Sequence, residues 1–389
     1  MSIARAARGY DKIHNMLKLY NSRTGKKEVF KPRYGKKVNM FVCGITPYDS
    51  AHIGNFKVFV NYDMLARYLR FKGYKLFYLQ NVTDVDDKII KAAKAENKSW
   101  RDVADFYFKE FREACDALHI ASVSEYAYAT AHIKEIIAQV KRLIEKGYAY
   151  EKNRSVYFEV RKFKNYGKLS GQNLAKLHQS VRLEKDPNKK HPYDFVLWKA
   201  REGPPAGGDE RYEPSWESPW GKGRPGWHIE DTAISEHYFG PQYDLHGGAV
   251  ELKFPHHEAE IAQQEAASGK KPFVKYWVHA GILMYGRQKM SKSLGNVITG
   301  KEMTRAHDPD VFRFLIASTH YRSPIPYSDR LMAQAKTRLE KIREFGRNLQ
   351  KAKGSAKGSL SLSPYVKNFF VSMDDDLSAP AALAVIFSL

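Results

Sequence analysis

Residues 38–96 alternate between strand-like and helix-like patterns, and this alternation constrains the fold more than any other feature of the sequence. Two strands and two helices are predicted in turn: a strand at 38–43 (VNMFVC), a helix from residue 55 that stops at Gly73, a strand at 75–85 and a helix at 86–96. This order predicts a doubly wound, parallel α/β sheet with its functional site at the carboxyl ends of the strands.

The regular alternation stops in the middle of the chain. Residues 152–160 (KNRSVYFEV) are typical of an antiparallel strand, while 185–192 and 201–214 are predicted to be loops. Strand-like and helical patterns resume at residue 226 and lead to a helix opened by 254–260 (FPHHEAE). We therefore expect an insertion within the α/β domain.

The C-terminal part of the sequence is mainly helical. Residues 333–353 form a basic helical pattern, and 353–364 (KGSAKGSLSLSP) are typical of a flexible linker. The last stretch, 378–389, places a serine before a first-turn proline and ends in mid-pattern. Because an apolar helix needs a surface that buries its face, we expect a helical bundle that is cut short.

Composition limits the setting and the partners. The 389 residues include 64 Lys and Arg against 43 Asp and Glu, a net charge of +21, which suits a polyanionic partner such as a nucleic acid. A general bias toward lysine is the alternative explanation. Only two cysteines are present, so we expect no disulfide framework and a cytoplasmic protein. No apolar run approaches the ~20 residues of a membrane helix.

Two motifs are typical of phosphate binding. The first, HIGN at 52–55, lies between a predicted strand and a predicted helix, where glycine permits close backbone approach and a helix N-terminus attracts phosphate. The second, QKMSKSLGN at 288–296, carries Lys289 and Lys292, which could hold successive phosphates of a triphosphate. A simple helix entry and a solvated basic loop are the respective alternatives.

The stretch FPHHEAE (254–260) permits two interpretations. His256 and Glu260 are four residues apart and share one face of a helix, where imidazole and carboxylate could bind a metal ion. Acidic residues also favour the first turn of any helix, because the backbone N–H groups there carry partial positive charge. The choice depends on residues elsewhere in the chain.

Taken together, the motifs resemble the class I aminoacyl-tRNA synthetases, and within them the cysteine-specific family. The resemblance runs from about Leu17 to the end, through FVCGITPYDSAHIGN, LQNVTDVDDKII, SPWGKGRPGWHIED, LHGGAVELKFPHHEAEIAQ and KMSKSLGN. It implies six segments: a basic N-terminal tail (1–16), the first half of a Rossmann-type catalytic domain (17–135), a connective insertion (136–215), the second catalytic half (216–285), a KMSKS loop with a stem-contact segment (286–330) and a truncated tRNA-binding helical bundle (331–389).

The resemblance also implies roles for individual residues. His52 and Asn55 would stabilise the ATP phosphates during catalysis, together with Lys289 and Lys292, and Gly54 and Glu251 would complete the ATP site. Three further residues match the lining of the amino-acid pocket: Thr83, Trp227 and His246. Asn55 replaces a commoner second histidine, but its amide can still donate to a phosphate oxygen.

Members of this family bind one zinc ion in the amino-acid pocket. The matching residues here are Cys43, His256 and Glu260, and Asp231 stands where many members have a cysteine. Aspartate is still an anionic zinc ligand, although a harder one than thiolate. Zinc would select cysteine over serine, because it prefers a soft thiolate to a hydroxyl.

Three hypotheses for function follow. The first is a monomeric ligase that activates L-cysteine with ATP and Mg²⁺ as cysteinyl-adenylate and transfers it to the 3′ end of tRNA(Cys) for protein synthesis. The second is a related ligase that joins activated cysteine to a small amine, as in the mycothiol pathway. The expected C-terminal shortening favours it, whereas the basic helix at 333–353 and the start of a helical bundle argue against it. The third is a truncated paralogue that only binds RNA; the intact motifs argue against it.

The remaining polar residues in the motifs have structural interpretations. Asp84, Asp86 and Asp87 are predicted to be helix-start acids rather than Mg²⁺ ligands. His257 and Glu258 are predicted to be structural or surface residues outside the metal site. Cys115 lies on an apolar helical face and is predicted to belong to the core.

Overall fold

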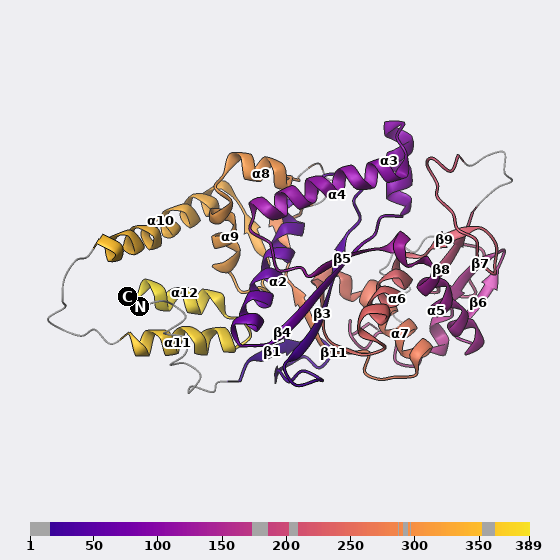
Figure 1. Ribbon diagram of the computed structural model, residues 1–389, viewed down its shortest axis with the longest axis horizontal. Coiled ribbons are helices and arrows are strands. Elements are labelled where there is room, and N and C mark those ends of the chain that lie inside the picture. The colour runs from indigo at the N-terminus through magenta and orange to yellow at the C-terminus, as the bar shows by residue number, and fades with distance from the viewer. Residues whose placement is uncertain are drawn as a thin grey trace.

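The computed structural model describes residues 16–172, 186–201, 209–286, 288–290, 295, 297–351 and 362–389, and of residues 288 and 289 it describes the backbone alone. The predicted N-terminal tail up to residue 15, the predicted linker as far as residue 361, and Lys292 lie outside these ranges. Figure 1 shows a central sheet with a smaller sheet at one end of the molecule and three helices, α10, α11 and α12, at the other.

The central sheet has five parallel strands in the order β11-β10-β3-β4-β5, which confirms the predicted fold class. Its strands are β3 (Lys37–Ile45), β4 (Lys75–Val82), β5 (Glu125–Tyr128), β10 (Tyr243–Ala249) and β11 (Val274–Ala280). The order reverses between β3 and β10. Ligands of open α/β sheets bind at the carboxyl ends of the strands beside such a reversal.

Helices cover both faces of this sheet. They are α2 (Ile53–Phe71), α4 (Trp100–Ala117), α5 (Ile133–Glu145), α6 (Trp227–Phe239) and α7 (His256–Ser268), whereas α3 (Asp87–Glu96) packs on α4 in a separate hydrophobic cluster. Alternate residues of β3 belong to different cores: Phe41 and Cys43 pack with α5, α6 and α7, whereas Met40 and Val42 pack with α2. The period of two along a strand therefore places Cys43 on the face that meets α6 and α7.

Three strands of the predicted insertion region and one strand beyond its predicted end at residue 215 form a separate antiparallel sheet, in the order β6-β7-β8-β9. Its strands are β6 (Ala149–Lys152), β7 (Ser155–Phe158), β8 (Phe195–Ala200) and β9 (Gly223–Pro225). The antiparallel strand predicted at 152–160 is thus confirmed in β7. Two small sheets complete the strands, β1 (Lys18–Asn21) with β2 (Lys26–Val29), and β12 (Leu283–Tyr285) with β13 (Gln288–Lys289) and β14 (Ile325–Tyr327).

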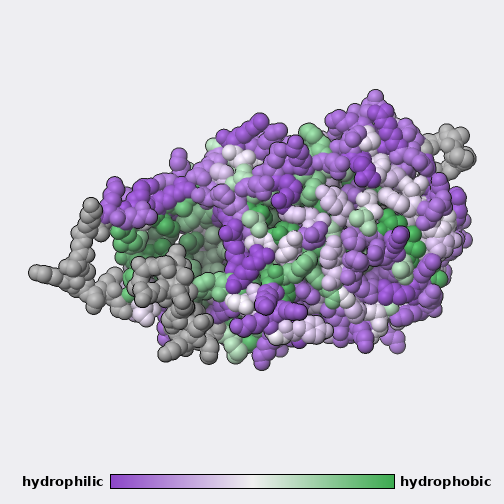
Figure 2. Space-filling view, viewed as in Figure 1, coloured by the Kyte–Doolittle hydropathy of each residue, from purple (hydrophilic) through white to green (hydrophobic). Residues whose placement is uncertain are grey.

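The C-terminal part is helical, as predicted, with α8 (Gly300–Ala306), α9 (Pro309–Ala317), α10 (Asp329–Lys351), α11 (Ser363–Asp374) and α12 (Ala379–Phe387). Asp376, between α11 and α12, accepts hydrogen bonds from the backbone of Tyr20 and from Tyr321, both at 2.7 Å. Phe345 and Leu349 of α10 remain 41% and 60% exposed, and Figure 2 shows hydrophobic surface beside this helix. This end of the molecule is therefore less completely buried than the central sheet.

Candidate active site at the strand ends

The four residues predicted as metal ligands lie together at the carboxyl end of the sheet. Cys43 stands near the end of β3, Asp231 in the second turn of α6, and His256 and Glu260 one turn apart on α7. Pro255 is the N-cap of α7, as the sequence predicted. The four side chains are almost completely buried, with Cys43 the most accessible at 6%. We call this group the metal cluster.

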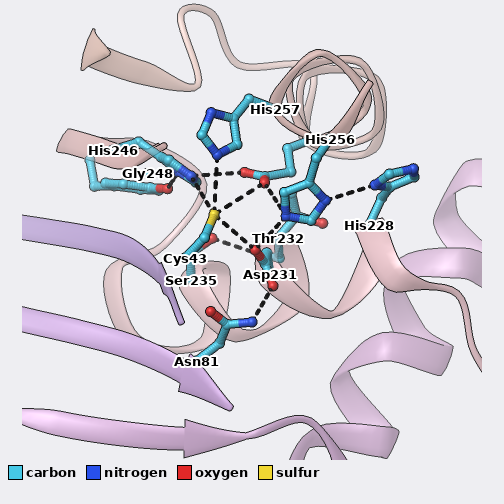
Figure 3. A network of polar contacts seen from close by, with 12 residues as sticks. Cys43, Asn81, His228, Asp231, Thr232, Ser235, His246, Gly248, His256 and His257 are labelled. Atoms are coloured by element: carbon cyan, nitrogen blue, oxygen red, sulfur yellow. Dashed lines mark hydrogen bonds and ion pairs between the residues drawn. The ribbon is translucent and has the colours of Figure 1, made fainter. Parts of the chain in front are cut away.

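The ligand atoms of the metal cluster face one another (Figure 3). Nε2 of His256 lies 3.0 Å from Oδ2 of Asp231 and 3.0 Å from Oε1 of Glu260. Sγ of Cys43 lies 3.4 Å from Oδ2 of Asp231 and 3.9 Å from Oε1 of Glu260. All four ligand atoms are within 4.8 Å of one another, a spacing that could hold one metal ion.

Electrostatics of the metal cluster favour a cation. Burial raises the pKa of the Cys43 thiol well above its ordinary value, and the charges of Glu260 and Asp231 raise it further. Burial also raises the pKa of Glu260, and the neighbouring carboxylate of Asp231 adds to this. A divalent ion would offset this crowding of like charges. One thiolate, two carboxylates and one imidazole form a donor set that fits zinc.

A second set of ligand atoms shares two members with the metal cluster. His246 on β10 and His257 on α7 join Cys43 and Glu260 in a group with the same spacing. Nε2 of His257 lies 3.1 Å from Sγ of Cys43, and Nε2 of His246 lies 3.5 Å from it. The sequence reasoning missed this set, because it placed His246 in the substrate pocket and removed His257 from the metal.

Neither His257 nor Glu258 is a surface residue, since their exposed fractions are 0% and 1%. Glu258 makes only structural contacts among the described residues, whereas His257 also belongs to the second set of ligand atoms, so its exclusion from the metal site stays a prediction. Nδ1 of His257 lies 2.8 Å from Nε2 of His279, and the Glu258 carboxylate accepts hydrogen bonds from the backbone of Leu169 and Ser170, both at 3.0 Å. Glu258 therefore fastens the insertion region to α7.

Aromatic and imidazole rings hold His256 in place. Its Nδ1 lies 2.8 Å from Nδ1 of His228, which leaves Nε2 facing the other ligands. The indole of Trp227 stacks on the His256 ring, with centroids 4.1 Å apart and planes inclined by 14°. Trp227 is 41% exposed and also lines the neighbouring cavity, so it separates the metal cluster from that cavity.

The other two residues predicted for the amino-acid pocket lie close to the metal cluster. Nε2 of His246 is 3.2 Å from Oε2 of Glu260. The hydroxyl of Thr83 donates to the carboxylate of Glu230, which precedes Asp231 in α6. Burial and the charge of Asp231 raise the pKa of Glu230, which favours its protonated form.

A cavity of about 550 Å³ lies beside the metal cluster. It is lined by four of the residues predicted to bind ATP: His52, Gly54, Asn55 and Glu251. A Cβ at position 54 would lie 2.8 Å from Nδ1 of His52, so a larger residue there would displace the His52 ring. Oδ1 of Asn55 accepts the backbone N–H of His52 at 3.1 Å, so its NH₂ group can donate to another acceptor. The helix α2 begins here, as predicted, and directs its N-terminus at the cavity.

The second phosphate motif is described only in part. Lys289 belongs to the short strand β13, which pairs with β12, and Met290 lines the cavity. Lys292 lies outside the described residues.

The acidic residues after β4 divide between two roles. Asp86 is the N-cap of α3 and Asp87 lies in its first turn, as predicted for helix-start acids. Asp84 is different, since its carboxylate accepts hydrogen bonds from the backbone and hydroxyl of Thr130. Cys115 is fully buried in the core, as predicted.

Comparisons with known proteins agree with this geometry. The sequence pattern of the tRNA synthetases class I (C) catalytic domain matches residues 29–337. The fold resembles that of methionyl-tRNA synthetase from Mycobacterium tuberculosis, solved with methionyl-adenylate, with a TM-score of 0.65, 14% identity, and 90% of this chain and 82% of that chain covered. The chain is a class I aminoacyl-tRNA synthetase.

Sequence relatives define the branch within this class. The cysteine–tRNA ligase of Thermoplasma acidophilum is 45% identical over 92% of this chain and 78% of its own length. That of Carboxydothermus hydrogenoformans is 44% identical over 96% of this chain and 79% of its own length. The chain therefore belongs to the cysteine–tRNA ligase family, and these relatives favour the first of the three hypotheses. Among the described residues, no helix is long and apolar enough to cross a membrane.

Proposed function

We propose that this chain joins L-cysteine to tRNA(Cys) in two steps. The carboxylate of cysteine attacks the α-phosphorus of ATP, which forms cysteinyl-adenylate and releases pyrophosphate. A hydroxyl of the terminal ribose of tRNA then attacks the carbonyl carbon, and AMP leaves. The observation that carries the proposal is the metal cluster, which lies next to the ATP-sized cavity with Trp227 between them.

The metal cluster is proposed to recognise the side chain of cysteine. Cys43, Asp231, His256 and Glu260 would hold zinc, with Thr83, Trp227 and His246 around the bound amino acid. Zinc bound there would supply a soft Lewis acid that binds the substrate thiolate and discriminates against the hydroxyl of serine. An apolar pocket alone separates such near-isosteres by only ~10²-fold.

The cavity is proposed to hold ATP with Mg²⁺. His52 and the amide of Asn55 would donate to phosphate oxygens at the N-terminus of α2, and Gly54 gives the phosphates room. Glu251, at the cavity wall, would meet the ribose. Lys289 and Lys292 would neutralise charge on the phosphates as pyrophosphate departs. Catalysis would thus depend on positioning and electrostatics rather than on a protein nucleophile.

The proposal is tested by ATP–pyrophosphate exchange with cysteine, with serine as the control and with bound zinc measured in the same sample. We expect exchange with cysteine only, and its loss after chelation. Exchange that does not depend on cysteine would contradict the proposal. A second assay offers the activated cysteine either tRNA or a small amine as acceptor, which separates the first two hypotheses. We expect transfer of cysteine to tRNA and none to the amine.

A further inference from the structure

Asp231 presents its two carboxylate oxygens to different partners. Oδ2 faces Cys43 and His256, at 3.4 and 3.0 Å. Oδ1 points away from them and accepts a hydrogen bond of 2.7 Å from the side-chain amide of Asn81, at the end of β4 (Figure 3). Asp231 and Asn81 are 1% and 3% exposed, so water does not compete for this contact.

A buried carboxylate has two oxygens that need partners, whereas a thiolate has a single sulfur. The second oxygen must bind the metal or accept a hydrogen bond, because a buried oxygen without a partner destabilises the fold. A cysteine side chain at position 231 would present a single sulfur. The hydrogen bond from Asn81 occupies the second oxygen of Asp231 and leaves Oδ2 as the one atom directed at the cluster.

The orientation of Asn81 is itself fixed by the neighbouring strand. Its Oδ1 accepts the backbone N–H of Gly44 at 2.7 Å, so its NH₂ group must be the part that faces Asp231. A Cβ at Gly44 would lie 1.8 Å from the backbone oxygen of Asn81, which shows how closely the two strands approach here. Asn81 thus connects β3, directly after Cys43, with the Asp231 carboxylate on α6.

We infer that Asn81 is a positioning residue for the metal cluster, which holds Asp231 as a one-oxygen ligand in the place of a thiolate. The inference rests on the proposed function, because it requires that the cluster bind zinc. Asn81 acts through Asp231 and does not touch the metal. Partners of this kind commonly change metal affinity by ~10- to 100-fold when they are removed.

The test is a set of four proteins: the unaltered chain, Asn81→Ala, Asp231→Cys and the double variant. Zinc affinity is measured by competition with a chromogenic chelator, and the ligand field by the visible spectrum after substitution with Co²⁺. We expect Asn81→Ala to weaken zinc binding by about 10- to 100-fold when Asp231 is present. In the Asp231→Cys background, the same substitution should have a much smaller effect, since sulfur has no second oxygen to orient.

The comparison between backgrounds separates this role from a general effect on the fold. Asn81→Ala also removes the acceptor for Gly44, and that loss is common to both backgrounds and cancels in the ratio. Asn81→Asp serves as a second variant, because it keeps an acceptor for Gly44 but faces Asp231 with an oxygen; when Asp231 is present, it should weaken zinc binding at least as much as Asn81→Ala.

The outcomes distinguish this inference from the proposed function. Zinc binding by the unaltered chain with equal effects of Asn81→Ala in both backgrounds would overturn the role of Asn81 alone. An unaltered chain that binds no zinc would overturn the role of Asn81 and the proposed zinc site. Cysteine-dependent pyrophosphate exchange by that chain would leave the proposed activation of cysteine standing, whereas absence of exchange would overturn the proposed function as well.

Discussion

The metal cluster and the ATP cavity adjoin each other, but they are built in different ways. The cluster draws its side chains from β3, α6 and α7 and buries all four, whereas the cavity is lined by partly exposed residues at the start of α2 and by the exposed Glu251. Burial, and after it the charge of neighbouring carboxylates, raises the pKa of Cys43 and of Glu260. The cluster therefore has the buried, charge-crowded character of a possible metal site, whereas residues that line the cavity are partly open to solvent.

The largest effect on the metal cluster is expected from a substitution of Cys43. We expect Cys43→Ser to reduce zinc affinity and cysteine activation by more than the ~10- to 100-fold that loss of a ligand's hydrogen-bond partner costs, because a neutral hydroxyl is a poor zinc ligand. Zinc content and pyrophosphate exchange measure the two effects. Cys115→Ser is the matched control at the other buried cysteine. It should keep zinc and activity, and a Cys43→Ser protein that retains full zinc would contradict the assignment of this ligand.

His52 tests the cavity without disturbing the cluster. We expect His52→Ala to lower kcat for pyrophosphate exchange by ~10²- to 10³-fold, as when one donor to a developing charge is removed, with zinc content unchanged. His237→Ala, at a 49% exposed side chain on α6, provides a comparison that should leave the rate unaltered. Loss of zinc from His52→Ala would show that the two regions are not independent.

A contact between Arg142 and Glu236 helps to hold α6, the helix that carries Asp231, against α5. Arg142 on α5 donates to Glu236 on α6, with Nη1 to Oε1 at 3.0 Å. Burial would raise the pKa of Glu236, but the hydrogen bonds and charge of Arg142, together with hydrogen bonds from Gln139 and Gln264, lower the pKa below its ordinary value. The pair therefore stabilises the fold at pH values above the ordinary glutamate pKa of ~4.3. This contribution is lost as the pH falls through the lower pKa that Glu236 has in the folded protein.

We expect Arg142→Met to lower the free energy of unfolding by about 1 kcal/mol at pH 7, since Arg142 is partly exposed and its charge is screened. The difference in the free energy of unfolding between the variant and the unaltered protein should shrink at pH values low enough to protonate Glu236. Denaturant unfolding at several pH values measures this. A difference that grows on acidification would contradict the role of Glu236.

The smallest effect is expected at Asp87, which precedes the cavity-lining Lys88. Its carboxylate contacts Arg224 and lies 3.1 Å from Nζ of Lys199, but its side chain is 67% exposed. We expect Asp87→Asn to cost less than ~1 kcal/mol and to leave zinc binding and kcat unchanged. Thermal unfolding and exchange kinetics measure both. A large fall in kcat would instead favour a role for this acid near Mg²⁺.

The parallel sheet could be predicted because periodicity is a local signal, whereas the set of Cys43, Asp231, His256 and Glu260 was implied only by the family resemblance. The helix starts at Ile53 and His256 are marked in the same way by residues close to them in the chain. The role of Asn81 could not be predicted, since it depends on Asp231, 150 residues further along. Asp84 looked like its neighbours in the sequence, and only its distant contact with Thr130 sets it apart.

One side chain contacts both regions, and this has a consequence for how the substrates bind. Trp227 stacks on His256 and forms part of the cavity wall. Occupation of either region would alter the surroundings of the same indole ring, so cysteine and ATP are expected to influence each other's affinity. Such coupling is reciprocal. The factor by which bound cysteine changes the affinity for ATP equals the factor by which bound ATP changes the affinity for cysteine.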